Sequence, residues 1–538
     1  MDSEKLLVTD SPSELTHREI MVVMTGVMLG MLVSALGQTV VATALPTIVG
    51  ELGGQDQLAW VVSATLLTST ASTPVWGKLS DLYGRRPLFQ AAIVVFLVGS
   101  VLCGLSQSMG QLIAFRAVQG LGIGGLLALS QAIIGDIVAP RERGRYQGYV
   151  GAVFGVSSVG GPLIGGFLVD GPGWRWCFYV GVPIGIAAFV VTSRVLTMPF
   201  IRRETKVDYL GASLIVAGVS LILILLSLGG QEFAWGSAEA VGMGIGSVVL
   251  LGLAVLQERR APEPIIPPRL FGVPTFRITS LASFIVGVAM FGAIVYMPQY
   301  LQIVKGQSPT RSGLLTIPLM LGLMALSIGS GRVITRTGRY KVFPVVGLVL
   351  VAIGMGLFSL LSVDTPLPVS GVYMFILGAG LGMVTQVLIL SVQNAVEHRD
   401  LGTATSAATF FRSMGGALGV AVFGAVLSNR LATYIPNRLA EAGVDAPAGG
   451  IDEFLGTPEA IAALPKLERD AVLGGFADAL SDVYTLAIPI AVIGILVVLF
   501  LPELPLRTSV RDADAVITEG EAAAAVFETS SSRDKLTH

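Results

Sequence analysis

Long apolar runs separated by short polar connections cover most of the chain. A run of about 20 apolar residues can cross the hydrocarbon core of a bilayer as a helix. Lipid offers no partner to free backbone groups, so each such run is expected to be an α-helix. The pattern predicts fourteen spans, at residues 20–45, 58–78, 88–107, 110–133, 145–169, 177–198, 208–228, 238–256, 277–302, 311–330, 342–362, 368–392, 403–427 and 481–501.

Composition agrees with a membrane protein and excludes several other classes. Charged residues make up 13% of the 538 residues, against about 25% in ordinary globular proteins. The net charge of −2 argues against nucleic acid as a partner. The two cysteines lack metal-ligand spacing, and the sequence contains no GxSxG, HExxH or GxxxxGK[ST] motif. We therefore predict no metal, no cofactor, no enzymatic activity and no ATP-driven pump.

The positions of the basic residues predict an orientation. Of the 34 Lys and Arg, 25 lie in one set of alternate connections and the span ends beside them, 7 lie in the other set, and two lie deep within spans. Positive charge marks the cytoplasmic side. Both termini are therefore expected in the cytoplasm.

Two segments of the sequence repeat at nearly equal offsets. "GKLSDLYGRRPLF" (77–89) aligns without gaps with "GRVITRTGRYKVF" (331–343), and "QGLG" (119–122) aligns with "AGLG" (379–382). Such parallel repeats indicate a transporter with its binding site between two halves. The predicted organisation is a cytoplasmic tail (1–19), a six-helix bundle (20–206), two inserted helices (207–257), a cytoplasmic linker (258–276), a second six-helix bundle (277–502) with an extracellular loop (428–480), and a disordered tail (503–538).

The long loop 428–480 is unusual for a compact domain, where loops of this length are often functional. We predict an extracellular flap, helical around 458–479, over the outer mouth of the cavity.

Five motifs occur in order along residues 20–500. They are "TVVATALPTI" (39–48), "GKLSDLYGRRP" (77–87), "LIAFRAVQGLGIG" (112–124), "GVSSVGGPLIGGFL" (155–168) and "GWRWCFYVGVPIG" (173–185). Together they resemble the major facilitator superfamily, and in particular its fourteen-helix drug:proton antiporters. The resemblance implies an all-α membrane fold with two pseudo-symmetric six-helix bundles and two inserted helices. It also implies a multidrug exporter that works by antiport.

The turn between the second and third spans has a physical interpretation as well. Glycine permits the tight reversal, and Asp81 suits the N-terminus of a neighbouring helix. A simple positive-inside anchor would explain the arginines, although it would explain neither the carboxylate nor the glycine spacing. By resemblance, the turn latches the two halves together through Gly77, Asp81, Gly84, Arg85 and Arg86.

The fifth span contains four glycines and a proline within seven residues. Such a run bends a helix and lets a neighbour pack closely. The family role would be a hinge or seal, and close packing alone is the alternative. The residues are Gly160, Gly161, Pro162, Gly165 and Gly166.

Charged side chains deep in a membrane are costly and usually functional. Arg116 and Arg412 are the two deep arginines, and we consider them, with Asp136, as candidates for charge relay and proton coupling. The alternatives are an Arg116 satisfied by carbonyls and Gln119, a structural Arg412, and a solvated loop position for Asp136.

Ligand sites in proteins are mostly apolar and contain few polar groups. On this basis the candidate cavity residues are Gly37, Gln38, Thr39, Gln119, Gln131, Tyr296, Gln299, Tyr300, Gln386, Gln393 and Phe410. Ordinary filling of the bundle is the alternative for each.

Gly37 departs from the family pattern, in which an aspartate usually precedes the motif threonine by two residues. The family carboxylate is expected near Arg116, so its absence leaves two deep arginines and no deep carboxylate. An intramembrane charge normally needs a partner. We therefore predict an electropositive cavity that favours anionic or neutral amphiphiles, lipids among them, over lipophilic cations. The alternative is that Gln38 and water satisfy Arg116 and the protein exports cations.

The sequence predicts a monomeric exporter of amphipathic small molecules in the cell membrane, driven by the proton gradient. One alternative is a transporter of lipids or anionic amphiphiles with weak or no proton coupling. Another is a receptor on the same fold that does not transport, because a fold alone does not fix function.

Overall fold

The structure is a computed structural model that describes residues 17–53, 57–196, 208–229, 233–444, 461 and 463–506. Within these residues the protein is all-α, with one isolated bridge between Gly229 and Phe233 and no strand. Twelve described helices are long and apolar enough to cross a membrane. Two more helices, α2 (Leu58–Tyr83) and the 17-residue α13 (Val342–Phe358), occupy the other two expected positions. The count of fourteen spans stays a prediction.

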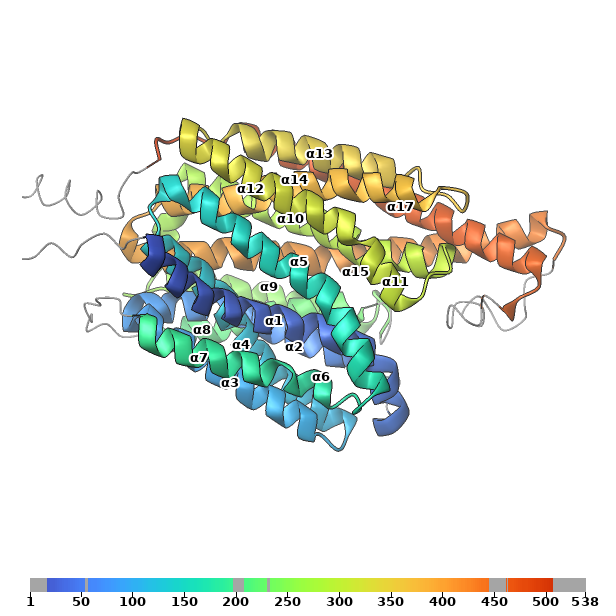
Figure 1. The fold of residues 1–538 in the computed structure, drawn as a ribbon, viewed down its shortest axis with the longest axis horizontal. Coiled ribbons are helices and arrows are strands. Elements are labelled where there is room, and N and C mark those ends of the chain that lie inside the picture. The colour runs from blue at the N-terminus through green and yellow to red at the C-terminus, as the bar shows by residue number, and fades with distance from the viewer. Residues whose placement is uncertain are drawn as a thin grey trace, which may run out of the picture.

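The helices follow one another with short connections (Figure 1). The first group contains α1 (His17–Leu52), α2, α3 (Arg85–Leu105), α4 (Met109–Ile137), α5 (Pro140–Asp170), α6 (Trp176–Tyr179) and α7 (Gly181–Val195). Next come α8 (Tyr209–Leu228) and α9 (Ala238–Glu258). The last group contains η2 (Pro268–Gly272), α10 (Pro274–Gln299), a π-helical turn η3 (Tyr300–Val304), α11 (Pro309–Leu315), α12 (Ile317–Thr337), α13, α14 (Leu367–Ala395), η4 (His398–Asp400), α15 (Leu401–Glu441) and α17 (Lys466–Leu499).

Several helices begin where the sequence supplies a cap. Ser108 accepts a hydrogen bond from Gln111 N at the start of α4, and Asp208 accepts one from Gly211 N at the start of α8. Such caps satisfy amides that a helix leaves unpaired. Gly84 has φ +94 between α2 and α3, a conformation that side chains resist, so glycine permits the reversal there.

The packing of the first group of helices is repeated in the last. In the first group α1 packs on α4, α5 and α7, α2 on α4, and α3 on α4 and α7. In the last group α10 packs on α14, α15 and α17, α12 on α14, and α13 on α14 and α17. The contacts between the groups repeat too, because α5 packs on α12 and α2 packs on α15. In Figure 1 the first group lies below the last. The domain boundaries themselves stay predictions.

The inserted helices lie on one side of the junction between the two groups. α8 packs on α9, α2 and α15. A shared apolar cluster joins α2, α8 and α15 through residues such as Ala71, Val219 and Phe410. The linker after α9 then returns to the end of the bundle where α2 meets α3. We call this the latch end, and the opposite end the far end.

The prediction of a loop at 428–480 is wrong for residues 428–441, whereas the helix predicted around 458–479 is confirmed for residues 466–479. Residues 428–441 continue α15, and residues 466–480 belong to α17, so the two helices project at the far end (Figure 1). Leu431 and Ile435 on α15 pack in one core cluster with Phe476 on α17. The apolar positions are spaced about one helical turn apart, so mean hydropathy falls although helical amphipathicity continues.

Some predicted segments lie partly outside the described residues. These are positions 445–460 and 462 of the predicted flap, residues 1–16 of the first tail and residues 507–538 of the last. The side of the membrane on which the projection lies stays a prediction.

Candidate functional site

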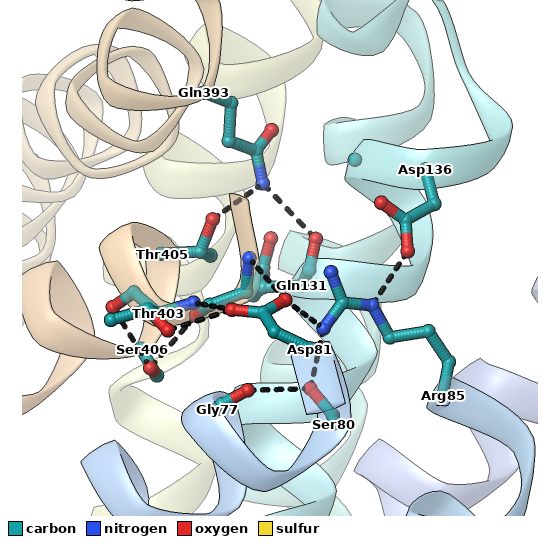
Figure 2. A network of polar contacts seen from close by, with 12 residues as sticks. Gly77, Ser80, Asp81, Arg85, Gln131, Asp136, Gln393, Thr403, Thr405 and Ser406 are labelled. Carbon is teal, nitrogen blue, oxygen red and sulfur yellow. Dashed lines mark hydrogen bonds and ion pairs between the residues drawn. The ribbon is translucent and has the colours of Figure 1, made fainter. Parts of the chain in front are cut away.

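Asp81 connects the two groups of helices at the latch end. It lies near the end of α2, and its carboxylate faces the first turn of α15 (Figure 2). It accepts hydrogen bonds from Gly402 N at 3.2 Å, from Thr403 N at 2.7 Å and from Thr403 Oγ1 at 2.7 Å. The N-terminus of a helix is electropositive and leaves amides unpaired, so a buried carboxylate is well matched to this position.

Arg85 binds Asp81 to a second carboxylate. Its guanidinium pairs with Asp81 and, through Nε, with Asp136 Oδ2 at 2.6 Å. All three side chains are less than a tenth exposed. Removing one member of a buried ion cluster leaves the remaining charges buried without compensation, which is strongly destabilising. The alternative of a solvated loop position for Asp136 is therefore wrong, because α4 ends against Arg85 inside the bundle.

The remaining residues of the predicted latch shape its surroundings. A Cβ added to Gly77 would collide with Ser406 on α15, so the glycine allows α2 and α15 to touch. Arg86 donates to the backbone oxygen of Ser193 near the end of α7. We define the latch cluster as Gly77, Asp81, Arg85, Asp136 and Thr403.

A buried amide network lies beside the latch cluster. Gln393 on α14 donates to Gln131 O on α4 at 3.1 Å and to Thr405 Oγ1 on α15 at 3.3 Å (Figure 2). Its Oε1 accepts from Arg143 of α5 at 3.1 Å. Gln147 Nε2 donates to Gln131 Oε1 at 3.0 Å. Gln131 and Gln393 are therefore parts of a cross-group contact, and both are almost fully buried.

Sequence reasoning missed Thr403 and Arg143. Thr403 stands at the beginning of an apolar run, where a hydroxyl is common as a cap. Arg143 stands in the basic segment "PRERGR" and looks like one more anchoring charge. The signal for Thr403 was available in principle, because a lone carboxylate in the opposing turn needs a helix N-terminus to accept from.

The linker after α9 binds to the same end. Lys78, which is buried on α2, pairs with Glu263 at 2.6 Å, and Arg269 pairs with Asp400 at 2.7 Å. Burial raises the pKa of the Asp400 carboxyl, and the guanidinium of Arg269 opposes that shift. A cavity of about 380 Å³ lies between the linker, the end of α2 and the residues before α15.

Arg116 is satisfied by neutral groups. It is buried in α4 and donates to Val61 O at 3.3 Å, Gly37 O at 3.0 Å and Gln119 Oε1 at 2.7 Å. The guanidinium also lies 5.9 Å from the centroid of the Phe178 ring. This is the arrangement of the structural alternative. Gln119 donates in turn to Ser100 Oγ at 2.7 Å, so it lies within the first group of helices.

Gly37 lies beside Arg116. A Cβ at position 37 would lie 3.0 Å from the Phe96 ring and 3.7 Å from Gln119 Nε2. A carboxylate there would thus stand close to Arg116, at the cost of displacing Phe96. A larger residue is therefore disfavoured in this packing.

Arg412 has a different environment. It is the twelfth residue of α15 and is partly exposed. Among the described residues its side chain forms no hydrogen bond or ion pair. Its backbone oxygen lies against α10, where a Cβ on Gly287 would collide with it. The two deep arginines therefore differ in their partners.

The glycines of α5 differ in their contacts. Gly161 and Gly165 face α1, where an added Cβ would collide with Thr39 and Thr43. Thr39 Oγ1 also donates to Ser157 O at 3.1 Å. Gly160 and Gly166 have no such neighbour, while Pro162 lies near Gly313 of α11. α5 continues as one helix through Pro162. Close packing is present, and a hinge or seal stays a prediction.

Several predicted cavity residues are buried in helix packing instead. Tyr296 donates to Val420 O at 2.7 Å, and Tyr300 donates to Ser362 O at 2.9 Å, both within the last group. Phe410 packs with α2 and α8, and Gln119 is satisfied as described above. The polar atoms of Tyr296, Tyr300 and Gln119 thus have partners within one group of helices, and a role in a substrate cavity stays a prediction for these residues. Gln38 is exposed, and Gln299 and Gln386 are partly exposed.

The fold and this junction define a class of helical membrane transporters. The model of the Major Facilitator Superfamily matches residues 27–420. The chain belongs to the major facilitator superfamily, whose members are transporters and not enzymes. It is accordingly a multi-pass membrane protein.

Relatives and solved structures agree with this placement. An uncharacterized MFS-type transporter of Mycobacterium tuberculosis is 43% identical over 92% of this chain and 71% of its own length. The multidrug transporter protein MdtP of Bacillus subtilis is 34% identical, with 93% and 96% covered. The fold resembles that of the proton:xylose symporter XylE with a TM-score of 0.59 at 16% identity, over 93% of this chain and 99% of that one.

Proposed function

We propose that the protein exports amphipathic small molecules across the cell membrane by alternating access, coupled to proton influx. Fourteen spans and cytoplasmic termini belong to this proposal, as does a monomer as the working unit. The latch end would then face the cytoplasm. Relatives named for multidrug transport and multidrug resistance support the substrate class.

The contact of Asp81 with Gly402 and Thr403 is the observation that carries the proposal. It joins α2 of the first group to α15 of the last through three hydrogen bonds. Alternating access requires the two groups to separate at this end. The bonds from Arg143 to Gln393 and from Gln393 to Gln131 must break in the same movement. Opening of this end therefore replaces buried polar contacts between the two groups by contacts with water, and closing restores them.

Proton coupling would use groups at the latch end. Asp81 and Asp136 are the carboxylates that share Arg85. Protonation of either one removes an ion pair from a buried cluster and weakens its hold on the partner helix. A proton could in this way favour the open state of the latch end.

Transport in proteoliposomes tests the proposal. Purified protein is reconstituted, a pH gradient is imposed, and accumulation of ethidium and of an anionic dye is followed by fluorescence. Accumulation that depends on the gradient and stops with a protonophore is the expected result. Equal dye movement in protein-free liposomes would refute transport, and movement indifferent to the gradient would refute coupling.

A second candidate is a transporter of anionic amphiphiles or lipids with weak proton coupling. Arg412 favours it, because this deep cation has no polar partner among the described residues. The same assay distinguishes the two by the sign of the dye that moves and by its response to the protonophore.

A further inference from the structure

Two carboxylates meet where the inserted helices reach the latch end. Asp208 caps the start of α8, and Glu258 is the last residue of α9. A Cβ added to Gly211 would lie 2.3 Å from Asp208 Oδ2 and 2.8 Å from Glu258 Oε1, so these two oxygens lie within about 5 Å of each other. Both residues are less than a tenth exposed. The two carboxylates therefore form a buried pair, and glycine at position 211 leaves room for it.

The pair has one oxygen without a donor. Asp208 Oδ1 accepts hydrogen bonds from Gly211 N at 2.9 Å and from Gln257 Nε2 at 3.0 Å. Asp208 Oδ2, the oxygen near Glu258, is buried and has no hydrogen-bond partner among the described residues. Buried polar atoms normally have partners, and each exception needs an explanation. An acceptor oxygen that faces a second carboxylate lacks a proton between the two groups.

The cations near the pair are engaged elsewhere. Lys78 of α2 lines the same cavity as Glu258 and pairs with Glu263 of the linker at 2.6 Å. Arg259, which follows Glu258, is exposed. The remaining charged residues that line this cavity already form ion pairs, and they are Asp81, Arg269, Arg399 and Asp400. In the described part of the chain no cation pairs with either carboxylate, and two carboxylates that share a site favour the uptake of one proton.

Glu258 also holds the linker in place. Its Oε1 accepts from Ile265 N at 3.0 Å, and its Oε2 accepts from Ile266 N at 2.9 Å. Ile265 is fully buried in the apolar cluster that joins α2, α8 and α15. Two residues earlier, Glu263 binds Lys78. The charge state of the pair therefore acts on the segment that connects α9 to the latch end.

We infer that Asp208 and Glu258 bind one proton between them and form a proton site separate from the latch cluster. The proton forms an O–H bond to one carboxylate oxygen, so the two negative charges become one, and the new donor faces the other carboxylate. Without the proton, two buried like charges repel and the hold of Glu258 on the linker weakens. Loss of the proton thus favours release of the linker, the reverse of protonation in the latch cluster. The use of this site in coupling rests on the proposed export.

Infrared difference spectroscopy of purified protein in nanodiscs tests for the shared proton. At about pH 7 exposed Asp and Glu are ionised, so the C=O stretch of a protonated carboxyl reports a buried one. Wild type should show such a band, and alkaline titration should remove it. Asp208→Asn and Glu258→Gln should each lose the same band, because the remaining carboxylate then has no charged neighbour that favours the proton.

Glu239→Gln is the matched control, because it removes a carboxylate from the exposed first turn of the same helix, and it should keep the band. Asparagine preserves the cap of α8, so Asp208→Asn is expected to fold. Absence of the band from wild type would overturn the inference, as would its persistence in either variant of the pair. If Glu258→Gln does not fold, wild type and Asp208→Asn still decide.

Hydrogen exchange at the amides of Ile265 and Ile266 measures the effect on the linker. After correction for the intrinsic effect of pH, exchange in wild type should rise about tenfold as the band disappears, as for one weakened hydrogen bond to a charged group. Asp208→Asn should stay protected, because its amide supplies the donor that the proton supplies in wild type. Exchange independent of pH in wild type would refute the hold on the linker.

Neither measurement involves transport, so the outcomes for this site and for export are separate. A missing band leaves the proposed export standing. Dye movement that is indifferent to the gradient would refute coupling and leave the proton site intact.

Discussion

The turns at 77–89 and 331–343 both reverse the chain at a glycine, and they differ in chemistry. Each contains a glycine with positive φ, Gly84 at +94 and Gly338 at +72. Each turn also contacts the end of the last helix in its group. Arg86 donates to Ser193 O in the last turn of α7, and Tyr340 donates to Pro502 O just after α17. The repeat therefore preserves a reversal and an anchor.

The turns differ in how they meet the opposite group. Asp81 receives three hydrogen bonds from α15, whereas the equivalent Thr335 offers only its backbone oxygen to Arg141 of α5 at 3.2 Å. Arg85 is buried between two carboxylates, while Arg339 is exposed. One side of the junction is thus held by buried charge and the other by packing of α5 on α12. A duplicated scaffold can carry a strong contact on one side alone.

The largest expected effect comes from removing the charge of the first turn. Asp81→Asn should lower transport by about tenfold or more, because a buried arginine and the α15 N-terminus lose their shared anion. Initial rates in proteoliposomes at equal protein content measure it. Asp364→Asn, in an exposed connection, is the control. Wild-type rates in Asp81→Asn would remove the latch from the mechanism.

A carboxylate added to the second turn should make the two sides more alike. Thr335→Asp would place an anion near the guanidinium of Arg141, which already contacts Thr335 O. An extra ion pair at a partly exposed site is worth up to about 1 kcal/mol, so opening should slow by about threefold. Transport rates at low and high salt measure this. Thr337→Asp is the control, and equal slowing there would contradict a local pairing.

The smallest expected effect comes from the contact of Tyr340 with the segment after α17, which lies away from the junction between the two groups of helices. Tyr340→Phe removes a buried hydroxyl that donates to Pro502 O at 2.9 Å and accepts from Leu504 N at 2.9 Å. Unfolding free energy should fall by about 1–2 kcal/mol, with transport at matched folded protein unchanged. Thermal unfolding of purified protein checks it against the exposed Tyr209→Phe. A loss of transport greater than the loss of folded protein would mean that the second turn also takes part in opening.

The sequence sufficed for the helices and for the position of Asp81, because both depend on local patterns. Hydropathy marks a span wherever one occurs, and an isolated carboxylate between glycines stands out. The pairing of Asp81 with Thr403 joins residues more than three hundred positions apart, and no local pattern identifies the partner. The bonds of Gln393 are hidden for the same reason.

Some candidate site residues of the same type differ in their surroundings, and these surroundings cannot be read from the sequence. Arg116 and Arg412 have equivalent patterns in the sequence, and their roles diverge only through the carbonyls that reach Arg116. Tyr296 and Phe410 are equally plausible as cavity residues from sequence, and the structure shows both of them buried in helix packing. The projection of α15 was missed because a window of mean hydropathy does not detect an amphipathic stripe.

The continuity of α15 has a mechanical consequence. Its 41 residues form a rod of about 60 Å at 1.5 Å per residue. Thr403 stands near one end, Arg412 about a quarter of the way along, and Arg438 is clamped to Asp478 of α17 near the other. A stiff rod that pivots within the bilayer moves its ends in opposite directions. Release at Asp81 would therefore exert a torque on the projecting pair of helices, and a load on that projection would be transmitted along α15 to Thr403.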